Sequence, residues 1–298
     1  MIENRPKIAI GPESPGFGSW EWVGQDLVDE LEMETVETFR DVVPSCDIAV
    51  FIKFKPPYEQ LCHLRERCHL VYCPVDIYGS AAEIDLDSDS LSVFDCLITH
   101  ASALTKYFSP YARVELVDHH VKYVAPLPTK QKTSGPVLWT GNASNLTPLV
   151  QWSRQNRLPE ELWILTNLQQ DALSPDRLGF NSYNRVRSEN WSPERHREWA
   201  QIAQAAIDIK GKDFRARHKP PTKAYDFIAS GLPLAMNAES RPIVDVAQHG
   251  LQLVEPTDIE QWFSKEYWEA TQLLGQKLNR ELSRSKVAQK LLRILYTL

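Results

Sequence analysis

A cluster of cations in the last third of the chain is the feature best suited to chemistry. The segment 210–223 holds one acid, Asp213, and its six cations are Lys210, Lys212, Arg215, Arg217, Lys219 and Lys223. The whole chain has a net charge of -6, so this local excess of positive charge stands out. Lysine and arginine bind phosphate and carboxylate groups through charge-assisted hydrogen bonds. The cluster therefore predicts a binding site for an anionic ligand.

The residues after the cluster predict a helix that begins beside the expected anion-binding site. The pair Pro220–Pro221 ends any earlier helix, Thr222 can cap the next one, and Lys223 falls in its first turn. A helix N-terminus offers unsatisfied N–H groups, and a bound anion would offset the unfavourable placement of a lysine there. Asp226 follows three residues later on nearly the same face, so it could meet the same ligand. The alternative for Lys223 is a merely solvated side chain, and the alternative for Asp226 is solvation on the helix or local pairing with Lys223.

Two breaks beyond this helix predict a buried strand and a ligand-binding edge. Gly231 can adopt the left-handed conformation that ends a helix, and Pro233 prevents a new helix as the chain enters 232–236. Parallel α/β sheets bind ligands at the carboxyl ends of their strands. The residues expected at this edge are Asn237, Glu239 and Ser240. For Ser240, the alternative is an ordinary N-cap of the following helix.

Short apolar runs alternate with helix-length segments along the whole chain. The runs are 7–11, 46–52, 69–73, 94–99 and 113–117, followed by 136–140, 161–166, 205–209, 232–236 and 251–254. Because parallel strands need long crossover connections, this alternation predicts an α/β protein with two Rossmann-like domains, each with a mainly parallel sheet flanked by helices. Proline and polar residues in 124–136 mark the boundary between the domains.

We therefore divide the chain into an N-terminal domain, 1–130, a C-terminal domain, 131–264, and a final helical segment, 265–298. In that last segment, leucines recur at helical spacing, which predicts one long amphipathic helix packing across the two domains. Peripheral membrane contact through its cationic face is the alternative. Earlier, a further short strand is expected before a helix that Ser192 caps.

Composition and charge exclude several classes of protein. The chain has 298 residues, 43% of them hydrophobic, which is enough for two cores. A pI near 5.8 argues against general nucleic-acid binding. The chain has no secretory signal pattern and no apolar run long enough to span a bilayer, so we expect a cytoplasmic protein without an integral membrane segment. Five cysteines without a CxxC pair predict reduced thiols and no metal site.

The segment 219–240 resembles the donor-binding helix of GT-B glycosyltransferases of the family 4-like, or group 1-like, type. In that family a K..E...A.G.P pattern precedes a core strand. The residues of this chain that match it are Lys223, Asp226, Ala229, Gly231 and Pro233. The segment 94–108 is similar to an acceptor-domain strand, serine turn and helix. The segment 114–126 is similar to the passage into the interdomain linker, with His119 in the histidine place, and 137–150 resembles the first strand and glycine turn of the donor domain.

The resemblance implies a metal-independent glycosyltransferase of hexosyltransferase type, with chemistry in a cleft between an acceptor-side domain and a nucleotide-sugar domain. Its partners would be a nucleotide sugar as co-substrate and an unknown acceptor, with no other cofactor. The residues expected to contact the donor are Lys219, Thr222, Lys223, Asp226, Asn237, Glu239, Ser240 and Gly141. Arg217 and Lys223 are the candidates to stabilise the departing diphosphate, and His119 is a candidate base.

The sequence departs from the family pattern at two places. His218 stands eight positions before Asp226, where related retaining enzymes usually carry an acidic residue, and 142–146 lacks the basic residues often found after the glycine turn. Two alternatives therefore stay open. One is a catalytically reduced sugar-nucleotide-binding or scaffold protein, and the other is a GT-B-like sugar-nucleotide epimerase.

Overall fold

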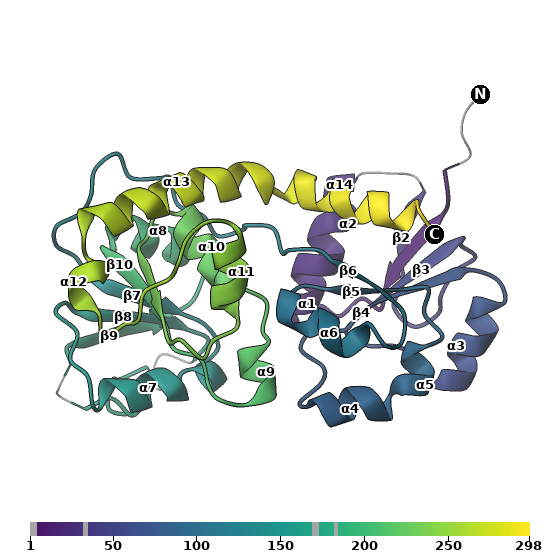
Figure 1. Cartoon of the computed structure of the whole chain (residues 1–298), viewed down its shortest axis with the longest axis horizontal. Coiled ribbons are helices and arrows are strands. Elements are labelled where there is room, and N and C mark those ends of the chain that lie inside the picture. Colours follow the sequence, from purple (N-terminus) through teal and green to yellow (C-terminus); the bar gives the residue numbers. More distant parts are fainter. Residues whose placement is uncertain (1–4, 32–34, 169–172, 182–183) are drawn as a thin grey trace. The chain divides into compact units, whose positions relative to one another are not determined.

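The chain forms two compact units in a computed structural model that describes residues 5–31, 35–168, 173–181 and 184–298. The first unit comprises residues up to His120, the short segment His218–Pro220 and the C-terminal segment Glu281–Leu298. The second comprises Val121–Arg217 and Pro221–Arg280. Figure 1 shows a parallel sheet with helices on both faces in each unit. The N-terminal stretch of the first unit ends at His120, and the proline-rich segment 124–136 belongs to the second unit.

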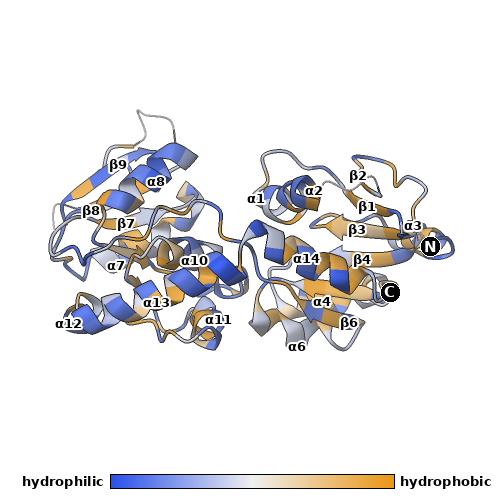
Figure 2. Ribbon diagram, turned by 90° about the horizontal axis from the view of Figure 1, so that it is seen from above, coloured by the Kyte–Doolittle hydropathy of each residue, from blue (hydrophilic) through white to orange (hydrophobic). Residues whose placement is uncertain are grey.

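The described part of the first unit holds a six-stranded parallel sheet. Its strands are β1 (Ile8–Gly11), β2 (Val36–Thr38), β3 (Ile48–Ile52), β4 (His69–Cys73), β5 (Cys96–Thr99) and β6 (Arg113–Leu116). They lie in the order β2-β1-β3-β4-β5-β6. Every residue of β1 and β3 is buried, as expected for a parallel sheet covered on both faces. Figure 2 shows β3 and β4 in the hydrophobic colour.

Short helices cover this sheet and connect its strands. They are α1 (Gly18–Trp20), α2 (Asp26–Leu31), α3 (Tyr58–Arg65), α4 (Ala81–Leu86), α5 (Ser88–Leu91), α6 (Thr105–Phe108) and α14 (Arg284–Leu295). A π-helical segment, Glu21–Gln25, joins α1 to α2. The last helix, α14, packs against α2, and its Arg284 Nε lies 2.9 Å from a carboxylate oxygen of Glu30.

The described part of the second unit holds a five-stranded parallel sheet. Its strands are β7 (Val137–Thr140), β8 (Leu162–Thr166), β9 (Val186–Asn190), β10 (Ala205–Asp208) and β11 (Leu234–Met236). They lie in the order β11-β10-β7-β8-β9. The chain first builds the sheet from β7 towards β9 and then returns to the other side of β7 to add β10 and β11.

The helices of the second unit pack closely on this sheet and on one another. They are α7 (Thr147–Ser153), α8 (Pro193–Ile202), α9 (Phe214–Arg217), α10 (Thr222–Ala229), α11 (Pro242–Gln248), α12 (Ile259–Trp262) and α13 (Lys265–Glu281). The closest approach is at Gly275 of α13, where a Cβ atom would lie 2.4 Å from the carbonyl oxygen of Ile228 in α10. Only glycine allows the two helices to come this close.

The expected parallel α/β architecture is confirmed in both units, and the strands differ from expectation at two places. The run 251–254 forms one β-bridge, between Val254 and Ala235, instead of a strand. The strand β2 was not predicted, because VET has no apolar run and its residues are only partly buried. The strand expected in 181–192 is present as β9, which has no fully buried residue.

One long C-terminal helix was the wrong prediction for 265–298. The segment forms α13 and α14, so it contributes one helix to each unit. The break lies at Ser283, whose extended backbone (ψ 151°) cannot continue a helix and whose hydroxyl accepts the N–H of Lys286. A serine in this conformation is a helix N-cap, so a new helix begins there. By contrast, Ser192 caps α8 as predicted, with Pro193 at the first position.

The described part of the chain has neither a membrane-spanning helix nor a disulfide bond. None of the helices in this part of the chain combines the length and the apolar character needed to cross a bilayer. All five cysteines lie in the described ranges and are free thiols.

Candidate functional site

The strand order of the second sheet marks one position for ligand binding. Connections leave β7 towards β8 on one side, and later strands are added beside β7 on the other side, so the strand order reverses between β7 and β10. In open α/β sheets, ligands bind outside the carboxyl ends of the strands at such a switch point. Thr140 and Asp208 are the last residues of β7 and β10 and therefore lie at this position.

Two lysines meet one buried carboxylate at this switch point. Lys223 Nζ lies 2.9 Å from Asp208 Oδ1, and Lys210 Nζ lies 2.7 Å from Asp208 Oδ2. Lys223 also donates to the carbonyl oxygen of Thr140 at 2.9 Å and lies 4.7 Å from the ring centroid of Trp139. The predicted local pairing of Lys223 with Asp226 is replaced by this contact with Asp208.

The electrostatics of this group leave it with one net positive charge. Asp208 is 1% exposed. Burial alone would raise the pKa of its carboxyl group, but the charges and hydrogen bonds of Lys210 and Lys223 outweigh burial and lower that pKa to about 2. The carboxylate is therefore ionised at neutral pH. It balances one of the two ammonium groups and holds both in fixed positions.

Gly141 provides the space that Lys223 occupies. Its φ is +153°, and a Cβ atom at this position would lie 3.2 Å from Lys223 Nζ and 3.2 Å from the Trp139 ring. The backbone N–H of Gly141 donates to the carbonyl oxygen of Leu165 at 3.0 Å. The geometry thus gives Gly141 a role in positioning Lys223, while direct contact with a donor stays a prediction.

Arg217 lies on α9 and carries a donor that lacks an acceptor. Its Nε atom is buried and has no hydrogen-bond partner among the residues that the structure describes. A buried N–H group without an acceptor costs stability comparable to a lost hydrogen bond. An anionic ligand oxygen would satisfy it. Arg217 is thus a further cation of the second unit, and its place in an anion site stays a prediction.

The residues after β11 form a hydrogen-bonded loop. The carboxamide of Asn237 accepts the N–H of Lys210 at 2.8 Å and the hydroxyl of Ser240 at 2.8 Å, and it donates to Glu239 at 3.2 Å. Ser240 is not the N-cap of α11, since that helix starts at Pro242 with Arg241 at the cap position. These contacts fix the loop that follows β11 against the loop that follows β10. Donor contacts by Asn237, Glu239 and Ser240 stay predictions.

Thr222 and Asp226 differ from the sequence-based expectation. The helix α10 begins at Thr222 itself, with Pro221 at the cap position, so the predicted cap by Thr222 is wrong. Asp226 is 2% exposed and accepts the backbone N–H groups of Lys122 at 2.8 Å and Tyr123 at 3.4 Å. Burial raises its pKa to about 7, although both N–H groups act in the opposite direction.

Lys223 and Asp226 therefore serve different partners although both lie on α10. Lys223 reaches the switch point, and Asp226 anchors the chain segment that follows His120. Ser230 supports the same anchor, because its hydroxyl accepts the N–H of Ala125 at 3.0 Å. The expectation that Lys223 and Asp226 share one ligand has no support in this geometry. A contact of Asp226 with a ribose stays a prediction.

Lys219 and His119 belong to the first unit, unlike the other candidate site residues. Lys219 follows His218, whose ring packs edge-on against Tyr107 with 5.4 Å between the centroids. His119 is 7% exposed, and its ring centroid lies 4.6 Å from that of His100. Burial, and then the neighbouring histidines, hold the pKa of His119 well below its usual range. His119 is thus a neutral, packed ring, and its role as a base stays a prediction.

Sequence reasoning missed Asp208 and Trp139. Asp208 is the last residue of β10 and lies within the run 205–209, and a charged residue at the carboxyl end of a buried strand was the signal that could have revealed it. Trp139 is fully buried in β7, and no sequence signal distinguished it from the other tryptophans. Among residues 5–31, 35–168, 173–181 and 184–298, no group of three His, Cys, Asp or Glu side chains is placed to hold a metal ion.

The whole chain is similar in structure to several glycosyltransferases. It matches AviGT4, a glycosyltransferase involved in avilamycin A biosynthesis, with a TM-score of 0.60 and 11% identity over 97% of this chain and 96% of that chain. It matches WaaG, a glycosyltransferase involved in lipopolysaccharide biosynthesis, with a TM-score of 0.56 and 10% identity over 96% and 99%. It also matches the trehalose-6-phosphate synthase OtsA, with a TM-score of 0.58 and 10% identity over 93% of this chain and 75% of that chain.

These similarities show that the chain has a GT-B fold with two Rossmann-like domains, as the sequence predicted. No protein-family description and no curated protein matches the sequence.

Proposed function

We propose that this chain transfers a hexosyl group from a nucleotide sugar to an acceptor hydroxyl, and that the donor diphosphate binds at the switch point of the second sheet. The GT-B fold supports this class of reaction. The observation that carries the proposal is the pair of lysines, Lys210 and Lys223, held by one carboxylate, Asp208. They lie at the switch point of the sheet, where open α/β sheets generally bind ligands. Together the two ammonium groups and the carboxylate carry one net positive charge, which would attract an anion.

The proposed chemistry needs stabilisation of a leaving diphosphate. In the transfer, the bond between the anomeric carbon and a diphosphate oxygen breaks and a bond to the acceptor oxygen forms. The proton of the acceptor hydroxyl passes to the leaving diphosphate or to solvent. Negative charge grows on the leaving diphosphate during this step. Lys223 is fixed in place by Asp208 and Thr140, so it could stabilise that charge with little reorganisation. Arg217 would add a charge-assisted hydrogen bond through its buried Nε. Side-chain cations rather than a divalent ion neutralise the leaving group in this proposal.

A donor panel with and without acceptors tests this function. Binding of UDP-, GDP-, ADP- and CMP-linked sugars to the full chain is measured by calorimetry, and nucleotide release is then followed with and without a mixture of sugar and glycoside acceptors. We expect binding of at least one donor and release that depends on an acceptor. Release without any acceptor would favour the epimerase alternative or hydrolysis. Binding without release would favour the scaffold alternative, and absence of binding to every donor would contradict the proposal.

A further inference from the structure

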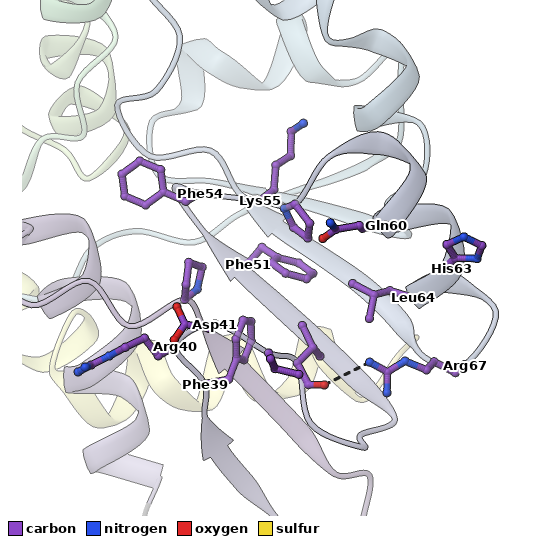
Figure 3. Close-up of a pocket in the computed structure, with 14 residues that line it drawn as sticks. Phe39, Arg40, Asp41, Phe51, Phe54, Lys55, Gln60, His63, Leu64 and Arg67 are labelled. Atoms are coloured by element: carbon purple, nitrogen blue, oxygen red, sulfur yellow. Dashed lines mark hydrogen bonds between the residues drawn. The ribbon is translucent and has the colours of Figure 1, made fainter.

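A pocket opens at the corresponding position of the first sheet. Here the chain adds β2 on one side of β1 and then β3 to β6 on the other, so the strand order reverses between β1 and β3. A cavity of about 580 Å³ lies beside this point, and its walls come from the segments that follow β1, β2 and β3 and from α3. Figure 3 shows the side chains that line it. Pockets of this size commonly bind small molecules.

Three phenylalanine rings give the pocket an apolar wall. Phe39 and Phe51 are 7% and 1% exposed, and their ring centroids lie 5.7 Å apart in an edge-to-face arrangement. Phe54 is 38% exposed, so it keeps a free apolar surface. Leu64 of α3 lines the opposite side (Figure 3). An apolar body of a ligand would find contact on both sides.

A strained turn holds Phe54 in place. Lys53 has a φ of +63°, which is uncommon for a residue with a side chain. The N–H of Phe54 donates to the carbonyl oxygen of Ile52 at 2.7 Å, so 52–54 forms a γ-turn with a left-handed central residue, a rare and strained type. Tyr72 donates its hydroxyl to the carbonyl oxygen of Lys53 at 2.8 Å and supports the turn. Strained backbone conformations of this kind are found most often at functional sites.

Arg67 gives the pocket a cation that is available to a ligand. The other cations of the lining have acidic partners, since Lys55 lies 2.9 Å from Asp87 and Arg40 lies 3.5 Å from Glu13. Arg67 donates to the carbonyl oxygen of Val43 at 3.2 Å, and no carboxylate of the described residues lies within ion-pair distance of it (Figure 3). Its remaining donors can bind an anionic group.

We infer that this pocket binds a small amphipathic anion, with its apolar body against the phenylalanine rings and its phosphate or carboxylate group on Arg67. The inference does not depend on glycosyl transfer, because every lining residue belongs to the first unit. A failure here would leave the proposed donor site of the second unit untouched.

Calorimetry of the full chain with octyl phosphate, below its critical micelle concentration, tests this inference. Inorganic phosphate lacks the apolar body, and octyl glucoside lacks the charge. We expect octyl phosphate to bind more tightly than either. Phe54→Ala should weaken binding of octyl phosphate about tenfold, because it removes part of the apolar wall. Arg67→Gln should also weaken it about tenfold, because it removes a charge-assisted hydrogen bond.

The control variant is Arg113→Gln, which changes an exposed arginine of β6 in the same unit and should leave binding unchanged. Thermal unfolding of each variant shows whether the fold is retained. Equal binding of octyl phosphate and octyl glucoside would overturn the role of charge, and equal binding of octyl phosphate and inorganic phosphate would overturn the role of the apolar wall. Binding that appears only with micelles would assign the face to an aggregate surface and would also overturn the inference.

Discussion

The switch points of the two sheets lie at the same topological position but differ in content. In the second sheet the position is filled by protein groups, because Lys223 lies between Asp208, Thr140 and Trp139. In the first sheet the position opens into a cavity of about 580 Å³ with phenylalanine walls. The fold thus places both sites, and the residue types decide that one presents fixed charge and the other presents apolar space.

Two clusters of buried ionisable groups, one in each unit, show a similar contrast. The first unit buries His100 and His119 as neutral rings, since burial lowers the pKa of His100 to about 4 and holds that of His119 well below its usual range. The second unit buries Asp208 as an ion, because two lysines hold its pKa at about 2. A unit that keeps a buried ion must also keep its counter-ions, so substitutions at the two edges should have unequal effects.

The largest effect is expected from Asp208→Asn. This change leaves Lys210 and Lys223 close together without their buried carboxylate, and breaking a buried ion pair in this way costs about 3–5 kcal/mol of unfolding free energy. Urea unfolding measures the change. The matched control is Glu269→Gln, which removes an exposed partner of Lys265 and should change stability by less than about 0.5 kcal/mol. Equal effects of the two variants would show that Asp208 is not an essential counter-ion.

Acidification should lower the stability of the two units by different amounts. A histidine whose folded pKa lies below its unfolded value contributes stability above about pH 6.5 and loses it as the pH falls. The first unit has two such residues, His100 and His119. The second has His196, with a pKa lowered by burial to about 4, but it also has Asp226, whose raised pKa adds stability as the pH falls below about 7.

We therefore expect the first unit to lose more stability than the second between about pH 7 and pH 4.5, by a difference on the order of 5 kcal/mol. Hydrogen exchange with correction for the intrinsic rate measures this for each unit. Asp226→Asn should remove the compensation and make the second unit more sensitive to acid. If both units lost protection equally in the unaltered protein, the contrast in buried groups would be wrong.

Two glycines near the switch points allow a smaller, matched comparison. Gly141→Ala places a Cβ atom 3.2 Å from Lys223 Nζ and from Trp139 in addition to the backbone strain at its φ of +153°. Gly16→Ala, in the loop after β1, carries backbone strain at a φ of +85°, but its Cβ atom meets nothing within 4 Å. We expect unfolding costs of about 2 kcal/mol and about 1 kcal/mol, respectively. Denaturant unfolding that ranks them in reverse would show that the space beside Lys223 is not restricted.

The sequence supports the architecture because buried parallel strands are continuous apolar runs. The runs at β1, β3, β4 and β7 are fully buried apart from His69. The edge strand β2 carries no such signal, since VET is polar and partly exposed. The split of the last segment was missed because the leucine spacing continues through Ser283, and only its cap geometry separates α13 from α14.

The candidate sites were less accessible to sequence reasoning because their partners come from distant segments. Lys223 was predicted from the cationic cluster, but its contacts with Asp208 and Thr140 depend on the strand order β10-β7. Asp226 looked like a ligand-binding carboxylate, and its burial against Lys122 and Tyr123 depends on tertiary packing. The pocket of the first unit draws on four separate segments, so no local pattern reveals it.

The smallest effect concerns the strained turn at the first switch point. Glycine adopts a positive φ without the steric cost that other residues carry. The free energy of unfolding should therefore be about 1 kcal/mol higher for Lys53→Gly than for Lys53→Ala. At ordinary strand positions alanine is the more stable of the two, so the reversed order is specific to strain. Urea unfolding of both variants measures this difference. If the alanine variant were the more stable one, the turn would not be strained in solution.

If the cations of the second unit bind the diphosphate of a nucleotide sugar, the variant Arg217→Ala should bind the donor more weakly. The control is Arg195→Ala, an exposed arginine of α8 in the same unit. Calorimetry at low and high salt should show that Arg217→Ala weakens donor binding about tenfold or more and flattens its salt dependence, while Arg195→Ala changes neither. An Arg217→Ala protein that binds the donor with unchanged affinity and unchanged salt dependence would contradict the account.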